Sequence, residues 1–446
     1  MKFGNEIDAV IKDVFGIDQS VDFIHFEVIY KDNDSEKYSS IKDGYEARLQ
    51  NHDERERLAK QLYIGEDFIL HTTVVFPVSE IKGLKRSSLF YYPICTREEI
   101  QRIERVANAE DYLLALRARS VASCPRLTRV FLRRREENIQ NWSLSSYYES
   151  YDFDHYISRL PDDMAEICQD IAAGYALSRE PHGVCISNEH GKIVVVSEAL
   201  KHFLFYMNAY FKGVMEDLAP EDTSACLFIA CRTMLLTETQ DFDLDPRGDL
   251  PDSVKQYCTK IVSDQLDFVI GHEYAHALLG HFGKDANLIS HSELLMISDG
   301  LGRAEKYFTP RHHQEFEADA GSILHADYDD EECADVLNGA VLFFLYIDIF
   351  YAISNYINPP FNPSRTHPDP IERLWALREA VLKARTVDVE SLYTDQEVED
   401  WIENMKGIKD HFVNELLPFG IEHFEFYGSV YLPSYRQSAM VDRLDF

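Results

Sequence analysis

The segment from Asp252 to about Phe282 constrains the fold of this chain more than any other. Apolar residues recur in it at helical spacing, which predicts one long helix. These residues are Val254, Cys258, Ile261, Val262, Leu266, Val269 and Ile270. The helix runs into His272-Glu273-Tyr274-Ala275-His276, and apolar residues flank this motif on both sides. We therefore expect a buried helix that carries two histidines.

The motif has the pattern His-Glu-x-x-His, which is typical of zinc sites. Because residues four apart lie on one helical face, His272 and His276 can offer two imidazole nitrogens to one Zn²⁺ at about 2.0 to 2.1 Å. Glu273 would project beside them, toward a bound water. The alternative is two core or surface histidines that bind no metal. The apolar flanks favour the zinc site, because they suit a helix buried at the floor of a cleft.

A catalytic zinc needs a third protein ligand and an open fourth position. In a metzincin, a third histidine stands ten residues after the first, with a glycine at seven. Here Gly280 and His281 stand eight and nine residues after His272, which breaks that spacing. A helix advances about 100° per residue, so His281 would point away from His272. We expect His281 to be a surface or helix-end histidine.

The best third ligand lies in the segment His313-Gln314-Glu315-Phe316-Glu317-Ala318-Asp319. Glu315 and Asp319 are four apart, so one carboxylate can bind zinc while the other accepts the N–H of a liganding imidazole, that of His272. Glu317 falls on another face and is expected to be solvated. Glu293 is the competing ligand. Its nearest downstream acid is six residues away, which fits one helical face poorly.

With these motifs the sequence resembles the gluzincins of the HtpX and CAAX-prenyl-protease type, in which H-E-x-x-H is followed by E-x-x-A-D. A third element, Thr366-His367-Pro368 with Arg373 six residues after the histidine, also matches. The resemblance covers about residues 254 to 380. It implies a zincin-like, mainly helical peptidase core in which Glu315 is the third ligand and His367 assists the oxyanion. Asp319 and Arg373 would support the ligands.

The remaining patterns predict an α+β fold with several parts. We expect an N-terminal α+β accessory domain at 1–140, a connection at 141–180, the zinc metallopeptidase domain at 181–385, and a helical and aromatic extension at 386–446 that packs on the core. Phe68 to Phe76 reads as a strand, and Val184–Ser187 with Lys192–Val196 as a β-hairpin. Ser197 stands at the N-cap position of a helix that continues to about Lys212.

Charge limits the partners of this chain. The net charge of -33 would repel nucleic acids and anionic membranes, so we expect neither as a main partner. Seven arginines between Arg117 and Arg135 could instead dock an acidic partner. The alternative is that they pair with the chain's own carboxylates, beginning with Glu136 and Glu137.

Two features predict a cytoplasmic protein. The eight cysteines contain no C-x-x-C pair, and the N-terminus carries acids where a signal peptide has basic residues. The segment Val341–Ile357 is strongly apolar. However, it is shorter than the ~20 residues that span a bilayer and carries Asp348 and Asn355. We expect it to be a buried core helix. The integral membrane helices of the gluzincin family are missing, so the chain looks like a soluble relative.

Together these patterns predict a cytosolic zinc endopeptidase that acts on a protein or peptide substrate. Zinc on His272, His276 and Glu315 would lower the pKa of its water toward about 7, and Glu273 would act as general base. One alternative is a non-catalytic zinc-stabilised interaction or sensor protein. Another is a regulated protease of stress or phage defence, gated by the N-terminal domain.

Overall fold

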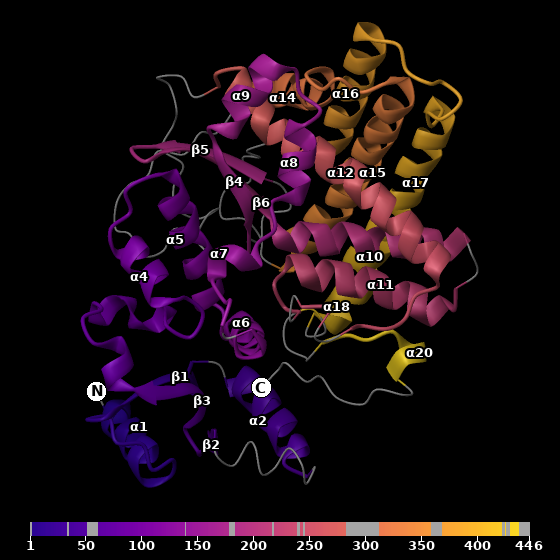
Figure 1. The fold of residues 1–446 in the computed structure, drawn as a ribbon. Helices are drawn as coiled ribbons and strands as arrows, with labels where there is room; N and C mark the ends of the chain where they lie inside the picture. Colours follow the sequence, from indigo (N-terminus) through magenta and orange to yellow (C-terminus); the bar gives the residue numbers. More distant parts are fainter. Residues whose placement is uncertain are drawn as a thin grey trace. The chain divides into compact units, whose positions relative to one another are not determined.

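The computed structural model describes residues 2–33, 35–50, 61–138, 140–177, 183–215, 218–238, 241–243, 246–281, 312–357, 368–421, 424 and 429–436. The chain divides into two compact units. The first comprises Met1–Arg105 and Val121–Ser143, and the second Val106–Ser120 and Leu144–Asp445. The described residues are mostly helical, with two small three-stranded sheets (Figure 1). This confirms the α+β class.

The first unit is a small antiparallel sheet with strand order β1-β3-β2 and a helix on each face. Successive side chains of a strand point to opposite faces. Phe68 and Leu70 of β3 accordingly pack against α1, whereas Ile69 packs against α2. The strand expected at Phe68–Phe76 is confirmed as β3. The elements are α1 (Lys2–Asp13), β1 (Asp22–Tyr30), α2 (Ser35–Arg48), β2 (Leu62–Ile64), β3 (Phe68–Pro77), η1 (Val78–Ile81), η2 (Arg86–Tyr91), α4 (Arg97–Glu104) and α6 (Pro125–Glu137).

The second unit joins a three-stranded sheet to a set of long helices. Strands β5 and β6 form the expected hairpin, and β6 pairs in parallel with β4. The helix expected after Ser197 is confirmed as α10. The elements are α5 (Ala109–Ala122), α7 (Leu144–Tyr147), α8 (Tyr151–Ile157), α9 (Asp162–Gln169), β4 (Ala172–Ala176), β5 (Gly183–Asn188), β6 (Gly191–Ser197), α10 (Glu198–Met215), α11 (Pro220–Met234), α12 (Asp252–Leu278), α14 (His312–Leu324), α15 (Asp330–Ile357), α16 (Pro370–Ala384), α17 (Asp395–His411), η3 (Phe412–Leu416), α18 (Leu417–Gly420) and α20 (Pro433–Arg436).

Helix α5 links the two units in sequence. Tyr112, Leu113 and Leu116 of this helix share a core with Ile186 and Ile193 of the hairpin, so most of α5 belongs to the second unit. The predicted domain limits at 140, 180 and 385 stay a prediction. The contact-based units differ from them, because α5 buries its apolar face against this sheet.

Helix α12 is the central helix of the second unit and contacts α8, α10, α14, α15 and β5. Every residue from Gln265 to Ala277 is buried. A buried polar chain fixes its position: Asn208 Nδ2 of α10 donates to Gln265 Oε1 (2.9 Å), and Tyr346 OH of α15 donates to Asn208 Oδ1 (2.9 Å). A helix enclosed on all sides holds its side chains rigidly, as a metal site requires.

The apolar segment Val341–Ile357 lies in α15. By length and composition α15 could cross a membrane, but 83% of its most apolar window is buried inside the protein. This confirms the expectation of a core helix. The following α17 packs along it, with an ion pair between Lys409 and Asp348.

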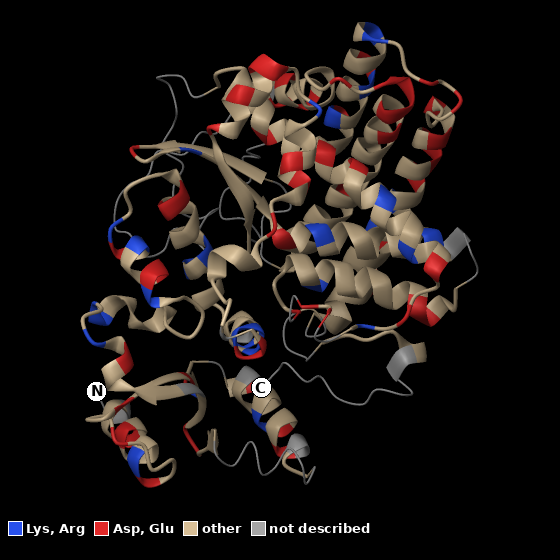
Figure 2. Cartoon of the chain, in the orientation of Figure 1, with Lys and Arg blue, Asp and Glu red and all other residues tan. Residues whose placement is uncertain are grey.

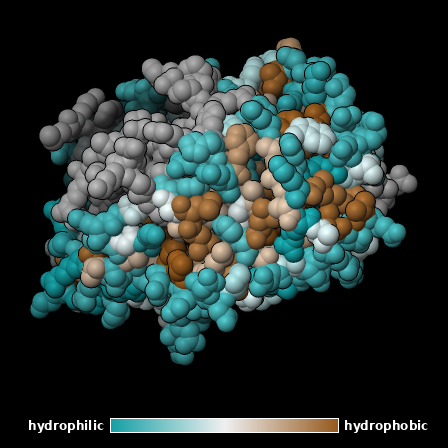
Figure 3. Space-filling view, turned by 90° about the horizontal axis from the view of Figure 1, so that it is seen from above, coloured by the Kyte–Doolittle hydropathy of each residue, from teal (hydrophilic) through white to brown (hydrophobic). Residues whose placement is uncertain are grey.

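Charged residues occur along most of the chain, and acidic ones predominate on the helices of the second unit (Figure 2). Figure 3 shows a face on which apolar residues lie among hydrophilic ones. Most arginines of the stretch from 117 to 135 are engaged within the chain. Arg117 and Arg119 are buried, and Arg129 Nη1 lies 2.7 Å from Glu27 Oε1. These contacts favour pairing within the chain over the docking of an acidic partner, which stays a prediction.

We expect Asn208→Leu to lower the free energy of unfolding by about 2 to 4 kcal/mol, because it leaves the buried Gln265 and Tyr346 without their shared partner. Tyr346→Phe removes only one of these hydrogen bonds and should cost about 1 kcal/mol. Chemical denaturation measures both. If neither variant changes the free energy of unfolding, these hydrogen bonds do not hold α12 in place.

Candidate metal centre

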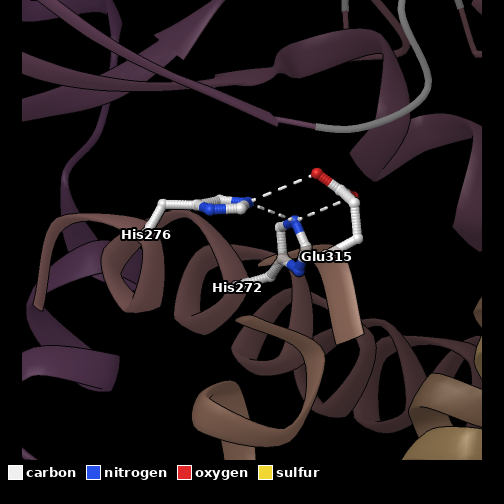
Figure 4. Close-up of side chains that lie close together, drawn as sticks. All are labelled: His272, His276 and Glu315. Carbon is white, nitrogen blue, oxygen red and sulfur yellow. Dashed lines mark hydrogen bonds and ion pairs between the residues drawn. The ribbon is translucent and has the colours of Figure 1, made fainter. Parts of the chain in front are cut away.

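Three side chains from two helices converge in the second unit (Figure 4). His272 and His276 lie one turn apart on α12, so both rings project from the same face. Glu315 comes from the first turn of α14. His272 Nε2 lies 3.1 Å from His276 Nε2, and the two nitrogens lie 3.7 and 3.6 Å from the carboxylate oxygens of Glu315. All three residues are buried.

These distances fit a single tetrahedral metal ion. Two ligand atoms that are each 2.0 to 2.1 Å from a tetrahedral ion lie roughly 3.3 to 3.4 Å from one another. The two nitrogens lie 3.1 Å apart, and each lies 3.7 or 3.6 Å from a different oxygen of Glu315, so all three separations are near that value. His272, His276 and Glu315 could therefore hold one metal ion with little movement of their side chains.

Asp319 stands one turn after Glu315 on α14 and supports His272 from behind. Its Oδ1 lies 2.9 Å from His272 Nδ1, on the side of the ring opposite the nitrogen that faces Glu315. Arg373 of α16 binds Asp319 through two bonds, from Nε to Oδ2 (2.8 Å) and from Nη2 to Oδ1 (2.6 Å). Arg373 Nη2 also lies 3.4 Å from Glu315 Oε2. The arginine thus fixes both carboxylates.

The ionisable groups of this cluster shift one another's pKa toward the charged forms. Burial by itself raises the pKa of Asp319, but Arg373 and His272 outweigh it and the pKa is lowered, so the carboxylate is ionised. Burial likewise lowers the pKa of His272, whereas Asp319 and Glu315 raise it above its ordinary value. The pKa of Arg373 is raised by the same carboxylates in spite of burial. The carboxylates of this cluster therefore favour the positively charged forms of His272 and Arg373.

His281 is not the surface histidine that the sequence predicts. Helix α12 ends at Leu278, and Gly280 adopts the left-handed conformation (φ 69°). The N–H of Gly280 donates to Ala277 O and that of His281 to His276 O, the two bonds of a Schellman cap. The reversal brings His281 Nδ1 to 2.8 Å from His276 Nδ1, and the ring is buried. The structure thus confirms a position at the end of the helix, whereas the expected exposure of His281 was wrong, because the helix was taken to continue to about Phe282 and the reversal at Gly280 turns the ring inward.

Glu273 lies against the start of β5. A Cβ atom on Gly183 would stand 2.4 Å from Glu273 Cγ, a separation that side chains cannot reach. Any larger residue at position 183 would have to displace the Glu273 side chain. Glu273 is buried and its side chain is held between α12 and β5.

A cavity adjoins Glu273 and His272. Most of its wall is apolar and comes from α12, α15 and the start of α16. The lining residues are Phe268, Val269, His272, Glu273, Phe343, Phe344, Ile347, Tyr351, Pro368, Pro370 and Arg373. Glu273 and one candidate ligand thus line the same small, mostly apolar cavity.

The structure brings together most of the predicted site residues. His272, Glu273, His276, Glu315, Asp319 and Arg373 all lie in this cluster. Glu317 is exposed, as expected. His367 and the competing ligand Glu293 lie outside the described residues, so their roles stay predictions.

No protein-family model, curated protein or solved structure matches the chain. The resemblance to the gluzincins therefore stays an expectation from the sequence motifs.

Sequence reasoning missed the contacts of His281 and of Gly183. The first had a local signal: a glycine directly after a helical pattern is a common helix end, and Gly280 stands in that place. The second had none, because Gly183 and Glu273 meet only through the packing of β5 on α12.

We expect Gly183→Ala to displace Glu273 and leave the metal ligands in place. The variant should bind the same amount of metal as the wild type, measured by elemental analysis, and lose most of any hydrolytic activity. Gly44→Ala, at a glycine with open space around the added carbon, is the matched control. Full activity of Gly183→Ala would show that the contact with β5 does not position Glu273.

Proposed function

We propose that this chain is a zinc-dependent metallopeptidase. The observation that carries the proposal is the buried meeting of His272, His276 and Glu315 at ligand distances, with Glu273 on the same helix and in a shared cavity with His272. A purely structural cluster has no use for an acid beside its ligands. The substrate of the peptidase would be a protein or a peptide.

The ligand types favour zinc over other metals. Two imidazoles and one carboxylate, with a fourth position left for water, are typical of catalytic zinc, whereas magnesium and calcium prefer oxygen ligands. Zinc, when bound, supplies a Lewis acid that polarises a carbonyl and lowers the pKa of water. Asp319 and Arg373 hold His272 and Glu315 in the orientation that such an ion needs.

Glu273 would move the proton. As water attacks the peptide carbonyl, an O–C bond forms and the carboxylate of Glu273 accepts the proton that the water releases. When the C–N bond breaks, Glu273 delivers this proton to the leaving amine, so that one water is consumed for each bond cut. Its packing against Gly183 would keep the carboxylate aimed during both transfers. The resemblance adds His367 as a donor to the developing oxyanion.

Two features indicate how a peptide could bind. The small cavity beside Glu273 has a mostly apolar wall, which would favour an apolar substrate group next to the bond that is cut. Among the described strands β5 pairs only with β6, so it ends the sheet. An extended peptide could add to this edge by main-chain hydrogen bonds.

The depth of the site favours a second candidate. His272, Glu273, His276 and Glu315 are each less than 10% exposed, which also suits a zinc ion that stabilises a non-catalytic interaction or sensor protein. The role of Glu273 separates the two candidates, because only the peptidase needs a base.

We expect Glu273→Gln to keep one zinc per chain and to lower peptide hydrolysis by about 100- to 10,000-fold, the usual contribution of a general base. His272→Ala should lose both zinc and activity. Glu379→Gln, an exposed position on α16, is the matched control and should behave as the wild type.

Because the substrate is unidentified, new protein termini in cells that produce the wild type are compared with those in cells that produce Glu273→Gln. The peptidase proposal requires termini that only the wild type generates, enriched in apolar residues beside the cut. Zinc binding without any such termini would support the non-catalytic candidate instead.

A further inference from the structure

We propose that His281 and Glu317 are positioning residues for the ligand His276, linked to it as a chain of hydrogen bonds that sets the tautomer and orientation of its ring. This inference rests on the proposed metal site. It starts from two distances: 2.8 Å between the Nδ1 atoms of His276 and His281, and 3.5 Å between His281 Nε2 and Glu317 Oε2.

The helix cap holds His281 in place. Its own N–H donates to His276 O, so the backbone of the supporting residue is bonded to the residue that it supports. The ring of His281 is 7% exposed and that of His276 is 5% exposed. Two rings buried at this separation have little freedom to turn. The contact is therefore set by the fold and does not depend on surface side chains.

Proton positions explain why the two Nδ1 atoms meet. His276 Nε2 faces His272 Nε2 and Glu315, so this nitrogen must carry its lone pair toward a metal ion. A neutral imidazole then has its proton on Nδ1. Nδ1–H of His276 donates to Nδ1 of His281, which must carry its own proton on Nε2. That nitrogen faces Glu317, an acceptor. With these proton positions, the contact between His276 and His281 and the contact between His281 and Glu317 each have one donor and one acceptor.

The two ligand histidines are then supported in parallel. Asp319 stands behind His272 directly, and Glu317 stands behind His276 through His281. Glu315, Glu317 and Asp319 all come from α14, so one helix would provide a ligand and both supporting carboxylates. Asp319 is buried, whereas Glu317 is 58% exposed and more strongly screened by water. We expect Asp319 to matter most, His281 next and Glu317 least.

The test compares His281→Leu with His281→Asn in the full chain. Leucine fills the space but accepts no hydrogen bond, whereas the amide oxygen of asparagine can accept the proton of His276 Nδ1. Zinc affinity is measured by competition with a chelator. We expect a loss of about 10- to 100-fold for His281→Leu, the usual effect of removing such a support, and recovery of most of it for His281→Asn.

A packing role predicts the opposite order, because leucine is the better apolar filler. The visible spectrum of the Co²⁺-substituted protein gives a second readout: His281→Asn should match the wild type and His281→Leu should not. Glu317→Ala should weaken zinc binding only when His281 is present. If His281→Leu does not fold, which the thermal unfolding of the metal-free variants shows, Glu317→Ala alone gives the test, and an unchanged zinc affinity of this variant would overturn the role of Glu317.

The inference is overturned if the wild type binds zinc and His281→Leu binds it equally well, or if His281→Leu and His281→Asn lose the same affinity. Those results leave the peptidase proposal intact. A wild type that binds no zinc overturns both. Zinc binding that depends on His281, together with full hydrolysis by Glu273→Gln, overturns only the catalytic role.

Discussion

The contact between α12 and α14 is the constraint on which the rest of the second unit depends. It places two imidazoles of one helix against two carboxylates of the other, all buried. Ionised groups removed from water are costly unless they are paired. Arg373 supplies one positive charge, and its two bonds to Asp319 make the pairing specific. A divalent cation held by His272, His276 and Glu315 would add positive charge beside the second carboxylate, that of Glu315.

The surrounding elements serve to hold this contact. Helices α10 and α15 fix α12 through the chain of Asn208, Gln265 and Tyr346, and α16 brings Arg373 to the rear of the ligands. Strand β5 covers Glu273 at Gly183. The first unit has its own core around β3, and in the part of the chain that the structure describes it contributes no residue to the metal-ligand cluster. The gating of a protease by the N-terminal domain, one alternative from the sequence, stays a prediction.

The sequence predicts the local part of this site well. Spacing of four residues places His272 with His276 and Glu315 with Asp319, because each pair lies on one face of a helix. Arg373 was placed by its position in a family motif, since a contact over 54 residues has no local signal. The contact between Gly183 and Glu273 needs the packing of a strand on a helix, which spacing does not give. The burial of His281 was missed although Gly280 signals a helix end, because the contact of this ring with His276 depends on the reversal of the chain after Leu278.

The most direct test of the central claim is X-ray absorption at the zinc edge of the purified chain, with the metal content determined in parallel. The account predicts one zinc per chain, bound by two imidazole nitrogens and by oxygen at about 2.0 to 2.2 Å. In His272→Ala, both the bound zinc and its absorption signal should be lost. A chain that binds no zinc, or binds it through sulfur at about 2.3 Å, would contradict the account. So would an imidazole signal that survives in His272→Ala.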